Sequence, residues 1–197
     1  MTSDVYEFNG TEKDYRIIPD TAEKLARYGS LDDKSVLRLR LLAEELICMM
    51  PNLLSYGSGK FWAESEGNEY RLHLSVAIAD KNNFDRNAVL SVSSTGKNAA
   101  AKGIINKICA AFEYMVEERA KLAKNDPYGF YMMSTPGGSE SMAWSLLSYK
   151  EDVDGSSGED KDEAWDELEK SIIAKLADDV IVGVLNGKAD ITVKKSF

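Results

Sequence analysis

Val180-Ile-Val-Gly-Val-Leu185, Asn186-Gly187 and Ala189-Asp-Ile-Thr-Val193 form the stretch that decides the fold class of this sequence. Asn-Gly favours the positive backbone angles of a two-residue turn, and the β-branched residues on either side favour strands. The stretch therefore predicts a β-hairpin. Strands at 60–65 and 69–78, joined by a short turn that contains glycine, predict a second hairpin. Two hairpins indicate a mixed or mostly antiparallel sheet.

Working toward the N-terminus, apolar residues spaced three or four apart predict a helix over Val36–Met50, which Pro51 ends. Ser30 or Asp32 is its expected N-cap. A shorter helix is predicted at 21–28, closed by Gly29.

The first residues of the chain alternate in a way that is typical of strands. Short strands are predicted at 5–8 and 15–18, with a hairpin turn near Asn9-Gly10.

Between the two hairpins the sequence predicts three further helices, at 99–124, 141–149 and 162–179. In the last of them Trp165, Leu168, Ile172 and Leu176 are expected on one face. Residues 151–161 are rich in glycine, serine and acids, and they predict an exposed acidic loop.

The expected fold is a single α+β domain over residues 1–197, a two-layer sandwich with its helices on one face of the sheet. The chain has 197 residues, of which 44% are hydrophobic, so it can bury a core. The other face of the sheet is expected to be open or used for a partner.

Charge is concentrated in one segment. The chain has 33 acids and 24 bases, and residues 151–169 hold ten of the acids and one base. The remainder, 23 acids and 23 bases, is neutral. We therefore expect no nucleic-acid ligand and no attraction to an anionic membrane.

Several other classes are disfavoured by the sequence. No apolar run reaches the roughly 20 residues of a membrane span, and the N-terminus shows no signal peptide, so a cytoplasmic location is expected. Two cysteines, Cys48 and Cys109, are too few for a disulfide framework and are expected to be buried. One histidine, His73, makes a histidine metal cluster impossible, and we expect no metal site.

The second predicted helix contains Leu41-Leu-Ala-Glu-Glu-Leu-Ile-Cys-Met49. With the order of elements, this segment resembles the Bergerat fold of the gyrase, histidine-kinase and mismatch-repair ATPases, and most closely the anti-sigma-factor serine kinases. The resemblance implies a site for ATP or ADP. It places Glu45 at the position of the family's catalytic glutamate and Met49 where the family has a Mg²⁺-binding asparagine. A thioether is a poor ligand for Mg²⁺, so a degenerate site is expected.

The resemblance also implies roles for two later segments. Asp80, at the end of a strand, would receive the adenine amino group. A glycine-containing segment before the long helix would hold phosphate through backbone N–H groups and nearby lysines. Its candidate residues are Thr95, Gly96, Lys97, Asn98, Lys102 and Gly103.

Each of these features also has an ordinary structural interpretation. Glu45 fits a boundary position where it pairs with an arginine or faces solvent. The segment 95–98 fits a helix cap with a solvated lysine. His73 alternates with leucines and fits a surface or half-buried strand position beside Arg71 and Ser75. The acids at 152–163 only partly match a Ca²⁺-binding loop, because Ser157 stands where glycine is needed.

The leading hypothesis is a catalytically inactive regulatory domain that binds a protein, such as a sigma factor or an anti-sigma antagonist. One alternative is an active ATP-dependent serine kinase, with Asn52 replacing the missing metal ligand. Another is a scaffold subunit without a small ligand, which uses its open sheet face or its acidic segment.

Overall fold

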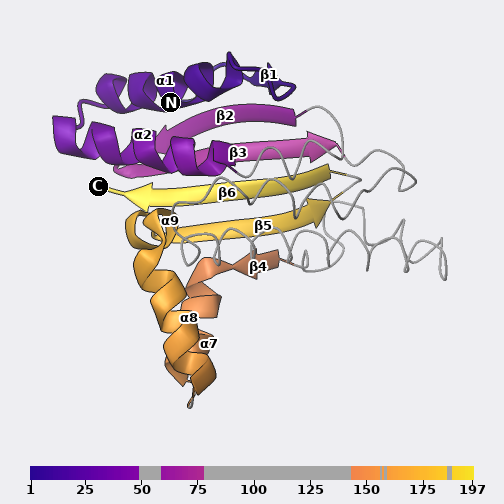
Figure 1. The fold of residues 1–197 in the computed structure, drawn as a ribbon. Helices are drawn as coiled ribbons and strands as arrows, with labels where there is room; N and C mark the ends of the chain where they lie inside the picture. The colour runs from indigo at the N-terminus through magenta and orange to yellow at the C-terminus, as the bar shows by residue number, and fades with distance from the viewer. Residues whose placement is uncertain (49–58, 78–142, 156, 158, 186–187) are drawn as a thin grey trace.

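Figure 1 shows a computed structural model of the chain, which describes residues 1–48, 59–77, 143–155, 157, 159–185 and 188–197. Within these ranges six strands form one sheet, accompanied by five helices. All strand pairs of this sheet are antiparallel, so the fold is α+β, as the hairpins predict. No helix of the described ranges is both long and apolar enough to cross a membrane.

The strands follow the order β1-β2-β3-β6-β5-β4 across the sheet (Figure 1). Two of the three predicted hairpins are confirmed, as β2–β3 and β5–β6. Gly67, with a φ of 58°, supplies the left-handed backbone at the turn of the first hairpin. The strands are β1 Tyr6–Phe8, β2 Gly59–Glu66, β3 Glu69–Ala77, β4 Ala143–Ser145, β5 Asp179–Leu185 and β6 Lys188–Ser196.

The two hairpins meet in the middle of the sheet, where β3 pairs with β6. Leu72 lies opposite Val193, and both side chains are fully buried. The next pair along, His73 and Thr192, points to the other face and is half-buried. One face of the sheet therefore carries the hydrophobic core, and the other carries mostly polar side chains.

Helix α1 (Asp14–Tyr28) differs from the prediction, because residues 15–18 are helical and not a strand. Ile18 is buried, and Ala22 and Leu25 follow it at helical spacing on the same buried face. The prediction of a strand rested on Ile17 and Ile18, two β-branched residues before Pro19 that favour strands. The helix actually begins at Asp14, whose buried carboxylate accepts hydrogen bonds from the backbone N–H groups of residues 9 and 11.

The predicted hairpin at Asn9-Gly10 is also wrong. Gly10, with a φ of 83°, turns the chain from β1 into α1, and β1 pairs with β2 instead. The physical reason is that Phe8 is completely buried, opposite Gly59, in the core that β2 shares.

Helix α2 (Asp33–Cys48) confirms the strongest sequence prediction. Asp32 is its cap, as expected, because its carboxylate accepts from the backbone N–H groups of Lys34 and Ser35. Leu39, Leu42 and Leu46 are fully buried on the face that meets the sheet and α1.

The chain before β5 corrects three further predictions, and in the first of them residues 143–145, expected within a helix at 141–149, form strand β4. Within the described ranges three helices lie between β4 and β5. They are α7 Leu146–Gly155, α8 Glu159–Lys170 and α9 Ile172–Leu176. The segment 151–161 is therefore largely helical and not a loop, although its acids at 151, 152 and 154 are exposed as predicted. The helix expected at 162–179 is divided at Ser171, whose Oγ accepts the backbone N–H of Ala174 and caps α9.

This division also changes which side chains are buried. Leu168 is buried, but Trp165 is 36% exposed and Ile172 is 43% exposed, so the four apolar residues do not form one buried face. The helix predicted at 99–124 and Cys109 lie outside the described residues.

Candidate functional site

Glu45 lies in the last turns of α2, one residue after Glu44 and beside the buried Leu46. Its side chain is half-buried. Burial, and secondly the negative charge of Glu44, raise the pKa of the Glu45 carboxyl above its ordinary value. Among the described residues no hydrogen bond or ion pair to this carboxylate is present. Glu45 is thus a half-buried carboxylate for which the described part of the chain supplies no paired cation.

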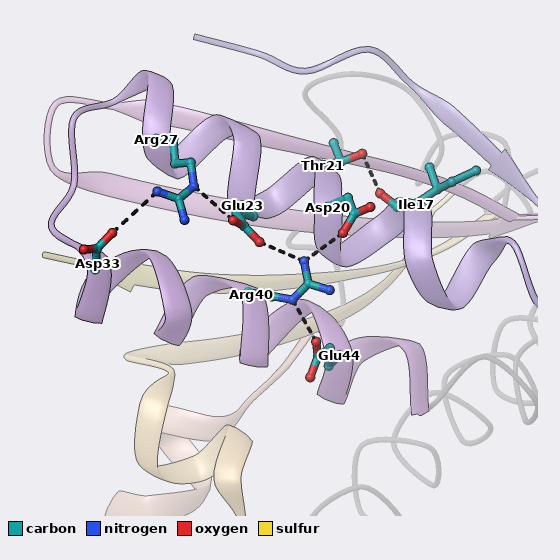
Figure 2. A network of polar contacts seen from close by, with 8 residues as sticks. All are labelled: Ile17, Asp20, Thr21, Glu23, Arg27, Asp33, Arg40 and Glu44. Carbon is teal, nitrogen blue, oxygen red and sulfur yellow. Dashed lines mark hydrogen bonds and ion pairs between the residues drawn. The ribbon is translucent and has the colours of Figure 1, made fainter.

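The nearby cation, Arg40, is used by other acids, as Figure 2 shows. Its Nη1 lies 2.8 Å from a carboxylate oxygen of Asp20 and 2.8 Å from one of Glu23, both on α1. Its Nε lies 3.1 Å from Glu44 on its own helix. Arg40 therefore ties α1 to α2, and it holds Glu44, not Glu45.

A second arginine extends this network along α1. Arg27 contacts Glu23 at 2.9 Å and Asp33 at 3.5 Å (Figure 2). Hydrogen bonds from Arg27 and Arg40 hold the pKa of Glu23 below its ordinary value. Because these side chains lie at the surface, the network contributes more to the fixed orientation of the two helices than to stability.

The remaining predicted site residues lie outside the described part of the chain. They are Asp80, Thr95, Gly96, Lys97, Asn98, Lys102 and Gly103, together with Met49. Glu45 is therefore the one predicted site residue that the structure places, and its pairing with an arginine, the ordinary interpretation, does not occur within the described ranges.

His73 lies on the face of the sheet that it shares with Arg71 and Ser75, as its alternation predicts. Its ring stacks on Trp62 at 4.8 Å between centroids, and its Nδ1 lies 3.1 Å from Thr192 Oγ1. Burial lowers the pKa of His73, although Glu64 opposes this effect. Burial in this packed position therefore disfavours the protonated imidazole. Within the described ranges no three acids, histidines or cysteines are grouped to bind a metal.

A groove that the sequence did not reveal lies at the edge of the sheet. It is a cavity of about 650 Å³ between the first six residues and one side of α1. Its α1 wall contains Ile17, Thr21, Lys24, Leu25 and Tyr28. Ile17 and Tyr28 are 11 positions apart on the helix, so the groove is about 16 Å long at 1.5 Å per helical residue.

Apolar side chains project into solvent beside this groove. Tyr28 is 79% exposed and Val5 is 57% exposed, and both line it. One feature of the sequence pointed to the exposed aromatic side chain: Tyr28 stands immediately before Gly29, which ends the helix, and its side chain faces away from the core. The groove itself depends on residues 1–5 lying beside β2, which local patterns do not show.

Comparisons with known proteins add no relative. No protein-family model matches the chain, and searches of curated proteins and of solved structures each found no match.

Proposed function

We propose that this chain is a regulatory, protein-binding domain with a degenerate nucleotide site, similar to the anti-sigma-factor serine kinases. Its partner would be a sigma factor or an antagonist of one. The proposal treats Glu45 as the remnant of a catalytic base on α2, and the domain as a binding protein rather than an enzyme.

The observation that carries the proposal is the environment of Glu45. A half-buried carboxylate with a raised pKa and no described cation costs free energy, and such groups are concentrated at functional sites. The neighbouring Glu44 serves as a comparison, because it has the ordinary role of a surface acid paired with Arg40. Position 45 therefore supports a role other than the packing of α2.

In this proposal the nucleotide lies beside the end of α2. Asp80 receives the adenine amino group. Gly96, Lys97 and the backbone N–H groups that follow them hold phosphate. Because Met49 stands at the metal position, nucleotide binding should not require Mg²⁺.

Calorimetric titration with ATP and ADP, each with and without Mg²⁺, tests this site. We expect binding that Mg²⁺ does not change. Glu45→Gln removes a negative charge near the terminal phosphate and should tighten ATP binding more than ADP binding. The matched variant Glu44→Gln removes a charge one residue away, from the Arg40 network, and should leave the ratio of the two affinities unchanged.

No binding at millimolar nucleotide would contradict the nucleotide site. Equal effects of the two glutamine variants would contradict the role of Glu45. Titration of purified sigma factors with and without ADP tests the partner, and we expect an affinity that depends on the nucleotide.

A second candidate, an active ATP-dependent serine kinase, is favoured by the raised pKa of Glu45, because a carboxylate with a higher pKa is a stronger base. It requires Mg²⁺-dependent nucleotide binding, with Asn52 or another residue as the replacement ligand. ADP formation that needs Mg²⁺ and is lost in Glu45→Gln would support it. No turnover in the presence of bound nucleotide would exclude it.

A further inference from the structure

The outer edge of the sheet begins before β1. Thr2 forms an isolated antiparallel bridge with Glu64, in which the N–H of Ser3 donates to the carbonyl of Ala63 and the N–H of Ser65 donates to the carbonyl of Met1. These bonds use the backbone groups on either side of Thr2. Thr2 is thus the residue whose own N–H and C=O point away from β2, toward the outer edge.

The register between the bridge and β1 contains one extra residue. Ser3 stands opposite Ala63, and Tyr6 stands opposite Phe61, so Asp4 and Val5 together face the single residue 62. This arrangement is a β-bulge, which bends an edge strand and redirects its side chains. It accounts for the exposure of Val5, which is 57% exposed and lines the groove.

The groove is lined by two side chains of opposite charge that form no ion pair with each other. Asp4 and Lys24 both line it and both are exposed. Within the described ranges neither forms an ion pair, whereas the acids on the other side of α1 are taken up by Arg27 and Arg40. The groove therefore combines apolar side chains with one acid and one base for which the described residues provide no ion-pair partner.

A groove that carries one acid and one base can be complementary in charge to a second copy of itself. In a contact with two-fold symmetry, residue i of one copy meets residue j of the other and the reverse contact follows automatically. One acid and one base on the same groove then form two ion pairs. The exposed Val5 and Tyr28 of each copy would then contact the apolar side chains in the groove of the other.

We propose that the edge groove is the contact surface between two copies of this chain, with Asp4 of each copy facing Lys24 of the other. The proposal is independent of nucleotide binding. The bulge at Asp4 and Val5 limits continuous strand pairing at this edge, so side chains in the groove provide most of the contact.

Charge reversal tests the pairing in trans. The full chain is studied by sedimentation equilibrium from micromolar to near-millimolar concentration, and the wild type is expected to dimerise. Asp4→Lys and Lys24→Asp each place like charges in both contacts and should raise the dissociation constant at least about tenfold. An equimolar mixture of the two variants restores both attractive contacts and should dimerise as heterodimers.

The controls are Glu12→Lys and Lys34→Asp, which make the same charge changes at exposed positions that do not line the groove. They should dimerise like the wild type, singly and mixed. A wild type that stays monomeric would overturn the proposal. Single variants that dimerise like the wild type would also overturn it. So would folded variants whose equimolar mixture stays monomeric, because that result would mean that Asp4 and Lys24 do not pair between copies.

Discussion

Replacement of Asp14 tests how α1 is anchored to the sheet. Its carboxylate is buried, with 1% of the residue exposed, and it accepts three hydrogen bonds. Tyr6 donates its hydroxyl at 2.6 Å, and the backbone N–H groups of Thr11 and Asn9 donate at 2.7 and 3.2 Å. Asp14→Ala removes the acceptor of all three bonds at the junction between β1 and α1.

The expected loss follows from these contacts. A hydrogen bond to a charged group contributes about 1.5–3 kcal/mol to the free energy of unfolding. Water can replace the acceptor at the exposed Asn9 and Thr11, so the three contributions do not add fully. We expect Asp14→Ala to cost about 3 kcal/mol and Tyr6→Phe about 1 kcal/mol. In the double variant the two losses should fall short of additivity by about 1 kcal/mol.

The assay is urea unfolding followed by circular dichroism, at several pH values. Burial raises the pKa of Asp14, but hydrogen bonds from Tyr6 and from the backbone outweigh it and hold the pKa below its ordinary value. This contribution to stability is therefore present above about pH 4 and is lost as the pH falls further. The bond to Asp14 raises the pKa of Tyr6 to about 12, so the contribution of the phenol is lost as the pH rises from about 10 to 12.

The reasoning would be refuted if Asp14→Ala cost less than about 1 kcal/mol at neutral pH, or if the losses of Asp14→Ala and Tyr6→Phe were strictly additive.

Three further predictions concern the rest of the described fold. Gly59→Ala should destabilise the protein by about 2 kcal/mol, because the added Cβ would lie 1.9 Å from the buried ring of Phe8. Thermal unfolding checks this, and the double variant with Phe8→Leu should recover part of the lost stability. Arg40→Met should lower stability by about 1 kcal/mol or less, and the difference from the wild type should shrink in high salt, as denaturant curves at two salt concentrations would reveal. The one histidine, His73, should titrate below pH 6.5 when followed by NMR. Its contribution to the free energy of unfolding should be present above that pH and lost as the pH falls. A titration midpoint above 6.5 would contradict the burial of its ring.

Local chemistry was sufficient to predict the elements whose signals are local. The β2–β3 and β5–β6 hairpins were predicted because alternation and turn residues act within a few positions, and α2 because its apolar spacing and its Asp32 cap agree. The first turns of α1 were missed because their start is fixed by Asp14, whose main side-chain partner, Tyr6, lies on a different element. The sequence does not show that contact, whereas the β-branched pair before Pro19 favours a strand.

The candidate site could be predicted only in part. The place of Glu45 on α2 follows from the sequence, but its half-burial depends on neighbours that helical spacing does not specify. The pairing of Glu44 with Arg40 follows an i, i+4 spacing, whereas the bonds of Arg40 to α1 arise only when the two helices pack. The edge groove arises only when Thr2 lies beside Glu64.

The pairing of β3 with β6 sets an order in time for the synthesis of this chain. His73 and Thr192 are neighbours across the sheet but 119 residues apart along the chain. A ribosome adding roughly 5–20 residues per second needs about 6–24 s to cover that distance. During this interval the backbone edge of β3 that later pairs with β6 is unpaired, and Leu72 lacks its neighbour Val193. We expect the β1–β2–β3 half to depend on chaperones until β6 emerges, and the closing of the sheet to be a late step of folding.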